Sequence, residues 1–149
     1  MECEGQGKRE EAHDLFARAW NESTTNFERF TAAHYVARHQ PTVEDKLVWD
    51  KLSRQHALHI ADGSASGACP SLYLNVAKGY EDLGDFDNAR KHYELGQTHL
   101  DSLPDDGYGK LIRGGIHNGL QRLRQQKRAR QSSLRPPSAG IPRSGKDLL

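Results

Sequence analysis

The order of large, small and glycine residues between positions 73 and 100 predicts two antiparallel helices that pack closely against each other. Apolar and small residues recur at spacings of three and four, which places them on one face of each helix. In the first helix they are Tyr73, Val76, Ala77 and Tyr80. In the second they are Phe86, Ala89, Tyr93, Gly96 and Leu100. Because small residues on these faces let backbones approach, the pair is suited to stacking against further helices.

The turn between the two helices is predicted at Leu83, Gly84 and Asp85. A glycine just past a helix end can adopt the positive φ that closes the last turn. The aspartate that follows can accept a hydrogen bond from the first amides of the next helix. The second helix is therefore expected to begin immediately after Asp85.

This segment resembles the tetratricopeptide repeat family, whose unit is a helix-turn-helix of about 34 residues. Seven positions match the family pattern in order: Tyr73, Ala77, Tyr80, Gly84, Phe86, Ala89 and Tyr93. The resemblance implies a solenoid of stacked helix pairs. It also implies that the first helix of each pair lines a concave groove for a peptide or a partner helix.

The same spacing occurs near the start of the chain, from Gly7 through Ala12 to Phe16. It predicts the second helix of a repeat whose first helix is missing. A truncated gene model, a fragment and a lone capping helix are all consistent with this pattern, since terminal repeats are often atypical.

Two further helices are predicted between residues 25 and 62. Thr25 followed by Glu28 is a capping box, which satisfies two amides at a helix start, and Pro41 ends that helix. Thr42 with Asp45 opens the next helix, which a polar loop at 62–67 terminates.

A last helix is predicted from about Tyr108 to Leu123, despite three glycines in its interior. Gly114, Gly115 and Gly119 each cost about 1 kcal/mol of helix stability relative to alanine. Close packing against the preceding helix pair is the simplest feature that would offset this cost.

The fold class is therefore all-α: a short tetratricopeptide-like solenoid of about six helices, in a domain at residues 1–127. Residues 1–120 hold thirteen Lys and Arg against nineteen Asp and Glu, whereas residues 121–149 hold eight basic residues and one acidic residue. Residues 128–149 also contain Pro, Ser and Gly, so we expect a disordered basic tail there.

The candidate partner-binding residues follow from the repeat resemblance. On the best-formed repeat they are Ser71, Leu74, Asn75, Lys78 and Glu81. Arg38 and His39 on the earlier pair, and Lys110 and Arg113 on the last helix, are candidates for the same surface. The resemblance gives Asn75 a role in contacting a peptide backbone or carboxylate, and a hydrogen bond within the repeat is the favoured alternative.

More widely, residues 33–41, 70–85 and 105–120 resemble a group of small bacterial tetratricopeptide-like proteins, some of which carry a ribosomal RNA adenine methyltransferase label. The sequence argues against this label, because it has no glycine-rich turn after a strand and no Asn/Asp-Pro-Pro-aromatic loop. His56 and His59 lack further ligands at metal-site spacing. We expect no enzyme activity, no cofactor and no metal.

The leading functional prediction is a cytoplasmic, non-catalytic protein-interaction scaffold that binds a peptide or partner helix, or associates with itself. The alternative is an accessory RNA or DNA module that uses the basic tail. No stretch has the apolar length of a membrane helix, and the first twenty residues are charged, so we expect no membrane association.

Overall fold

The computed structural model describes residues 2–137 and 140, with side chains from residue 7 onward, and the regular structure in this part is all helical. Six α-helices follow one another: α1 (Glu2–Glu22), α2 (Asn26–Arg38), α3 (Val43–Leu58), α4 (Cys69–Asp82), α5 (Phe86–Thr98) and α6 (Gly107–Ser133). Two short 3-10 helices, Ser66–Ala68 and Leu100–Ser102, lie in the loops before α4 and α6. The described residues contain no strand, and the predicted all-α class with six helices is confirmed.

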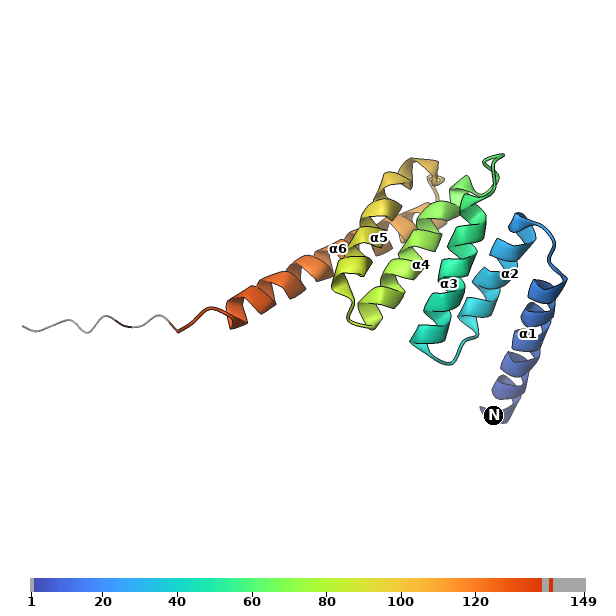
Figure 1. Ribbon diagram of the computed structural model, residues 1–149, viewed down its shortest axis with the longest axis horizontal. Coiled ribbons are helices and arrows are strands. Elements are labelled where there is room, and N and C mark those ends of the chain that lie inside the picture. Colours follow the sequence, from blue (N-terminus) through green and yellow to red (C-terminus); the bar gives the residue numbers. More distant parts are fainter. Residues whose placement is uncertain (1, 138–139, 141–149) are drawn as a thin grey trace, which may run out of the picture.

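The helices pack in chain order, so that each lies beside the next (Figure 1). Helices α2 and α3 form one antiparallel hairpin, α4 and α5 form another, and α3 packs against α4 to join them. Helix α1 lies at one end of this array, and α6 packs against α5 and α4 at the other. Within the described residues, no helix combines the length and apolar character needed to cross a membrane.

The predicted helix starts are confirmed by their caps. The Glu28 amide donates to Thr25 Oγ1 at 3.2 Å, and Glu28 Oε2 accepts from the Thr25 amide at 3.1 Å, which completes the capping box. Thr42 Oγ1 accepts from the Asp45 amide at 3.1 Å at the start of α3. These bonds satisfy amides that the first helical turn leaves without partners.

The turn between α4 and α5 also has the predicted geometry. Gly84 has φ of +79°, in the left-handed region that glycine adopts without strain. Asp85 caps α5, since its Oδ1 accepts from the Asn88 amide at 3.2 Å. The glycine and the aspartate together let α5 fold back along α4.

The main core lies between α4, α5 and α6. Its buried members are Ala77, Ala89, Tyr93, Leu103, Ile112, Ile116, Leu120 and Leu123. A smaller cluster of Ala57, Ala65 and Leu72 packs beneath the loop between α3 and α4. The array therefore contains two buried apolar clusters of unequal size.

Two glycines of α6 allow the close packing that the sequence predicted. A Cβ at residue 119 would overlap the ring of Tyr93, and one at residue 115 would lie 2.8 Å from Leu74 Cδ2. Gly114 differs, because a Cβ there would have no neighbour within 4 Å. Packing on α5 and α4 thus accounts for two of the three glycines.

Helix α6 extends beyond residue 127, where the sequence placed the end of the helical domain. Helix α6 continues through Ser133, so residues 128–133 are helical instead of forming the start of a disordered tail. Arg130 contributes to this continuation, because its guanidinium lies over the Phe86 ring at 4.9 Å from the centroid. Most of the remaining tail, residues 138–139 and 141–149, falls outside the described residues.

Candidate binding surfaces

The predicted residues on α4 divide into those that pack internally and those that reach the surface. Leu74 is half-buried against Gly115 of α6, and Ser71 Oγ donates to the Ala68 carbonyl at 2.9 Å. Asn75 is half-buried, and Lys78 is exposed and forms an ion pair with Asp82 one turn along the helix. The surface of α4 therefore offers mainly the amide of Asn75 and the charge of Lys78.

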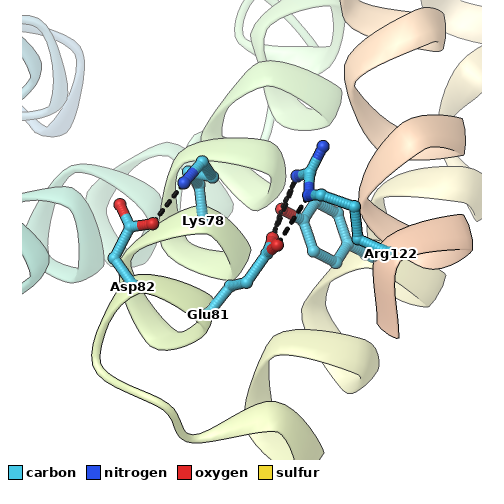
Figure 2. Close-up of polar contacts among 5 residues, drawn as sticks. Lys78, Glu81, Asp82 and Arg122 are labelled. Carbon is cyan, nitrogen blue, oxygen red and sulfur yellow. Dashed lines mark hydrogen bonds and ion pairs between the residues drawn. The ribbon is translucent and has the colours of Figure 1, made fainter. Parts of the chain in front are cut away.

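Glu81 belongs to a polar cluster that joins three helices (Figure 2). Arg122 of α6 donates from Nε to Glu81 Oε1 at 2.6 Å and from Nη2 to Oε2 at 3.0 Å. The hydroxyl of Tyr93 on α5 donates to the same Oε2 at 2.5 Å. This bidentate pair ties α4, α5 and α6 together, so the carboxylate of Glu81 already has its partners within the chain.

Burial and the hydrogen bonds of this cluster shift the pKa values of Glu81 and Tyr93. Burial acts to raise the pKa of Glu81, but the hydrogen bonds from Arg122 and Tyr93 and the Arg122 charge outweigh it and lower the pKa. The pKa of Tyr93 is raised, first by burial and then by its bond to Glu81. At neutral pH the cluster therefore holds a carboxylate, a neutral phenol and a guanidinium.

The two cations predicted on α6 have different environments. Arg113 donates to the backbone carbonyls of Leu100, Leu103 and Pro104 at 3.4, 3.2 and 3.4 Å. These contacts hold the loop that connects α5 to α6. Lys110 is exposed. Of the predicted pair, Lys110 alone is therefore directed to solvent, while Arg113 stabilises the loop.

Arg38 and His39 lie beside α1. The His39 ring stacks on Phe16 at a centroid distance of 5.3 Å. Both residues line a cleft of about 640 Å³ whose other walls include Arg9, Glu10, His13 and Asp14 of α1. The structure thus groups these two predicted residues with the first helix of the chain.

A second surface, which the sequence did not reveal, is a groove between α1 and α2. We call it the α1–α2 groove; its volume is about 560 Å³, and it is lined by Phe16, Ala19, Glu22, Ser23, Phe27, Glu28, Thr31, Ala32 and Tyr35. Phe27 is 51% exposed and Tyr35 is 40% exposed. Two aromatic side chains in one groove therefore expose large apolar areas to solvent.

Aromatic contacts from α1 to α2 and to α3 fix the position of this groove. Phe16 stacks on Tyr35 with ring centroids 4.9 Å apart and planes 9° apart. One turn further along the helix, Trp20 meets Trp49 of α3 edge to face at 5.2 Å. Helix α1 is thereby held on α2 and α3, and its Phe16 side lines the groove.

The histidines that the sequence considered as metal ligands form other contacts. His56 Nδ1 lies 2.9 Å from Asn26 Oδ1, and His59 Nδ1 lies 2.7 Å from the Gln55 carbonyl oxygen. In the part of the chain that the structure describes, no group of three or more His, Cys, Asp or Glu residues is placed to hold a metal ion.

Comparison with known proteins gives no relative from which a role could be transferred. No protein-family model matches the chain, and neither a curated protein nor a solved structure matches it.

Proposed function

We propose that this protein is a non-catalytic interaction module of the tetratricopeptide type, and that it binds an α-helix of a partner protein in the α1–α2 groove. The order of the helices supports this proposal. Two hairpins, α2–α3 and α4–α5, stand between the single helices α1 and α6. In such an array α1 has the place of a second helix, and the α1–α2 groove has the place that a helix packed against both α1 and α2 would take.

The observation that carries the proposal is the exposure of Phe27 and Tyr35 within a groove between two helices. Burying an aromatic side chain contributes roughly 1.5–3 kcal/mol. Aromatic residues at the centre of an interface often supply most of its binding free energy. A docked helix would cover both rings together with the methyl groups of Ala19 and Ala32.

The lining of the groove defines the chemistry of its partner. The aromatic rings favour a helix with apolar residues at spacings of three and four, as in other helix-in-groove complexes. Glu22 and Glu28 border the same groove; one oxygen of Glu22 lies near Arg18 and one oxygen of Glu28 accepts in the capping box, and each carboxylate has a second oxygen at the edge of the groove. The partner helix is therefore amphipathic and carries Lys or Arg beside its apolar stripe.

The face of α4 supports this function less well. Leu74, Glu81 and Arg113 already contact groups within the chain. Asn75, Lys78 and Lys110 remain candidates on that face, but they present isolated polar groups instead of an apolar area. We therefore assign the main binding role to the α1–α2 groove.

Site-specific photocrosslinking in cell extract tests the location of this site. A benzophenone amino acid replaces Tyr35 in one variant and Val48, which is 53% exposed on α3, in a matched control. We expect the Tyr35 probe to give a discrete adduct whose partner segment is an amphipathic basic helix, with no such adduct from the Val48 probe. Equal labelling at both positions, or adducts on extended or acidic segments, would contradict the proposal, and adducts with a second copy would assign the groove to self-association.

A further inference from the structure

The carboxyl-terminal half of α6 projects from the helical array (Figure 1). Leu123 is the last residue of α6 that is buried, and the helix continues to Ser133. The residues from 124 to 133 are all exposed and add about 15 Å of helix at 1.5 Å per residue. This segment, which we call the α6 extension, contains basic and polar side chains, one alanine and no acidic residue.

Cations from two helices converge at the base of the α6 extension. Arg124, Lys127 and Arg128 line one side of a shallow cleft of about 350 Å³, and Arg90 of α5 lines it from the other helix. Arg130 and Lys127 border the adjoining cleft, where Asp87 contributes a carboxylate. Residues more than thirty positions apart in the sequence thus form one basic surface.

Among the residues that the structure describes, none of these cations forms an ion pair with a carboxylate. The ion pairs among the described residues involve other basic groups, such as Arg122 with Glu81 and Lys78 with Asp82. Neighbouring like charges on a helix repel one another and cost stability. A polyanion that contacts several of them would relieve this repulsion and release its own counterions.

We propose that the α6 extension and Arg90 bind the phosphate backbone of duplex DNA, with the extension lying in the major groove. An α-helix with its side chains is about 10–12 Å across, which matches the roughly 12 Å width of the B-form major groove. The major groove of an RNA duplex is too narrow and deep for a helix. This surface lies at the opposite end of the array from the α1–α2 groove, and the inference does not depend on the function proposed for that groove.

Two properties of the surface favour a duplex over a single strand. Its cations are fixed along a rigid helix, as the phosphates of a duplex are fixed along each strand. Single-strand sites also need exposed aromatic rings on which bases stack. Phe86, which lines the adjoining cleft, is half-buried and has Arg130 over its ring, so it offers no free stacking face.

Fluorescence anisotropy with a labelled DNA duplex of arbitrary sequence tests the proposal on the full chain. Four phosphate contacts predict that the logarithm of the binding constant falls with the logarithm of the salt concentration with a slope of about −3 to −4. The triple variant Arg124→Gln, Lys127→Gln, Arg128→Gln should weaken binding at low salt at least tenfold and reduce the slope to about −1. Circular dichroism should show unchanged helicity, because the three side chains are exposed.

The matched control removes three cations at the far end of the array, through Lys8→Gln, Arg18→Gln and Arg29→Gln. It should bind DNA within about twofold of the wild type. This control removes the same three positive charges from the protein as the first variant does, but it leaves the α6 extension unchanged. Absence of duplex binding at low salt, or equal losses in the two triple variants, would overturn the proposal. Equal affinity for single-stranded DNA or duplex RNA would overturn the major-groove assignment, and equal affinity for polyglutamate would assign the surface to an acidic protein.

Discussion

The ring of Tyr93 on α5 fills the space that a side chain at Gly119 of α6 would occupy. Tyr93 is fully buried, and a Cβ at residue 119 would overlap its ring. The hydroxyl of the same tyrosine donates to Glu81 of α4. One side chain therefore sets the distance between α5 and α6 and links both helices to α4.

Substitution of Gly119 by alanine should destabilise the protein although alanine favours helix formation. The new methyl group would push α6 away from Tyr93, and overpacking of a close contact costs about 1–3 kcal/mol. Urea unfolding followed by circular dichroism measures the change.

Gly114→Ala is the matched control on the same helix. A Cβ at this position has no neighbour within 4 Å, so the change should stabilise the protein by up to about 1 kcal/mol. If both alanine variants shifted the unfolding free energy in the same direction, the packing explanation for the α6 glycines would be wrong.

The bidentate bond between Glu81 and Arg122 should contribute measurably to stability. A double-mutant cycle with Glu81→Gln and Arg122→Gln is expected to give a coupling of about 1–3 kcal/mol, because a largely buried carboxylate loses charged hydrogen bonds. The Glu81 side chain is 12% exposed.

The pair Arg18 and Glu22 provides the comparison for this cycle. Both side chains are more than 70% exposed and their charged atoms lie 3.9 Å apart, so the coupling should not exceed about 0.5 kcal/mol. Equal couplings for the two pairs would show that the Glu81 cluster does not join the helices in solution.

Acid should lower the unfolding free energy of the protein, in part by protonating Glu81. Its pKa is lowered in the fold, so its stabilising contribution is present above the unfolded pKa near 4.5 and is lost as pH falls through the lowered folded value. Unfolding free energies at neutral pH and at about pH 3 should therefore differ less in Glu81→Gln than in the wild type. An unchanged difference in the variant would exclude Glu81 as a source of the acid sensitivity.

Arg113 should contribute to the stability of the fold. Arg113→Ala removes hydrogen bonds to the carbonyls of Leu100, Leu103 and Pro104, and is expected to cost about 1 kcal/mol of unfolding free energy. Lys110→Ala on the exposed side of α6 should change stability by no more than about 0.5 kcal/mol. A larger loss at Lys110 than at Arg113 would contradict this assignment.

The sequence predicted those features of the fold that depend on nearby residues. Thr25, Thr42 and the turn at Gly84 and Asp85 act within a few positions of the chain, and their geometry was confirmed. The sequence also predicted that α6 packs closely against the preceding helices, because glycines inside a helix need a contact that compensates for their cost. The sequence did not indicate which of these glycines contacts another helix, because that depends on residues far away in the chain.

The candidate sites were harder to predict for the same reason. Glu81 and Arg122 lie 41 positions apart, so helical spacing gave no sign of their contact. Phe27, Thr31 and Tyr35 follow at spacings of four on α2 and share the face that lines the groove, but which face of α2 meets α1 depends on distant residues. The repeat-like spacing from Gly7 to Phe16 predicted a helix in this region, but Gly7 lies within α1 and not in a turn, and the spacing did not reveal the groove.

Peptide affinities of three proteins test whether the α1–α2 groove is the binding site. The probe is a synthetic peptide of the helix that crosslinks at residue 35, and isothermal titration calorimetry measures its binding to the wild type, Phe27→Glu and Val48→Glu. Phe27→Glu should weaken binding at least tenfold, which corresponds to about 1.4 kcal/mol, whereas Val48→Glu should bind within about twofold of the wild type. Equal affinities of all three proteins for the peptide would contradict the assignment of the groove as the binding site.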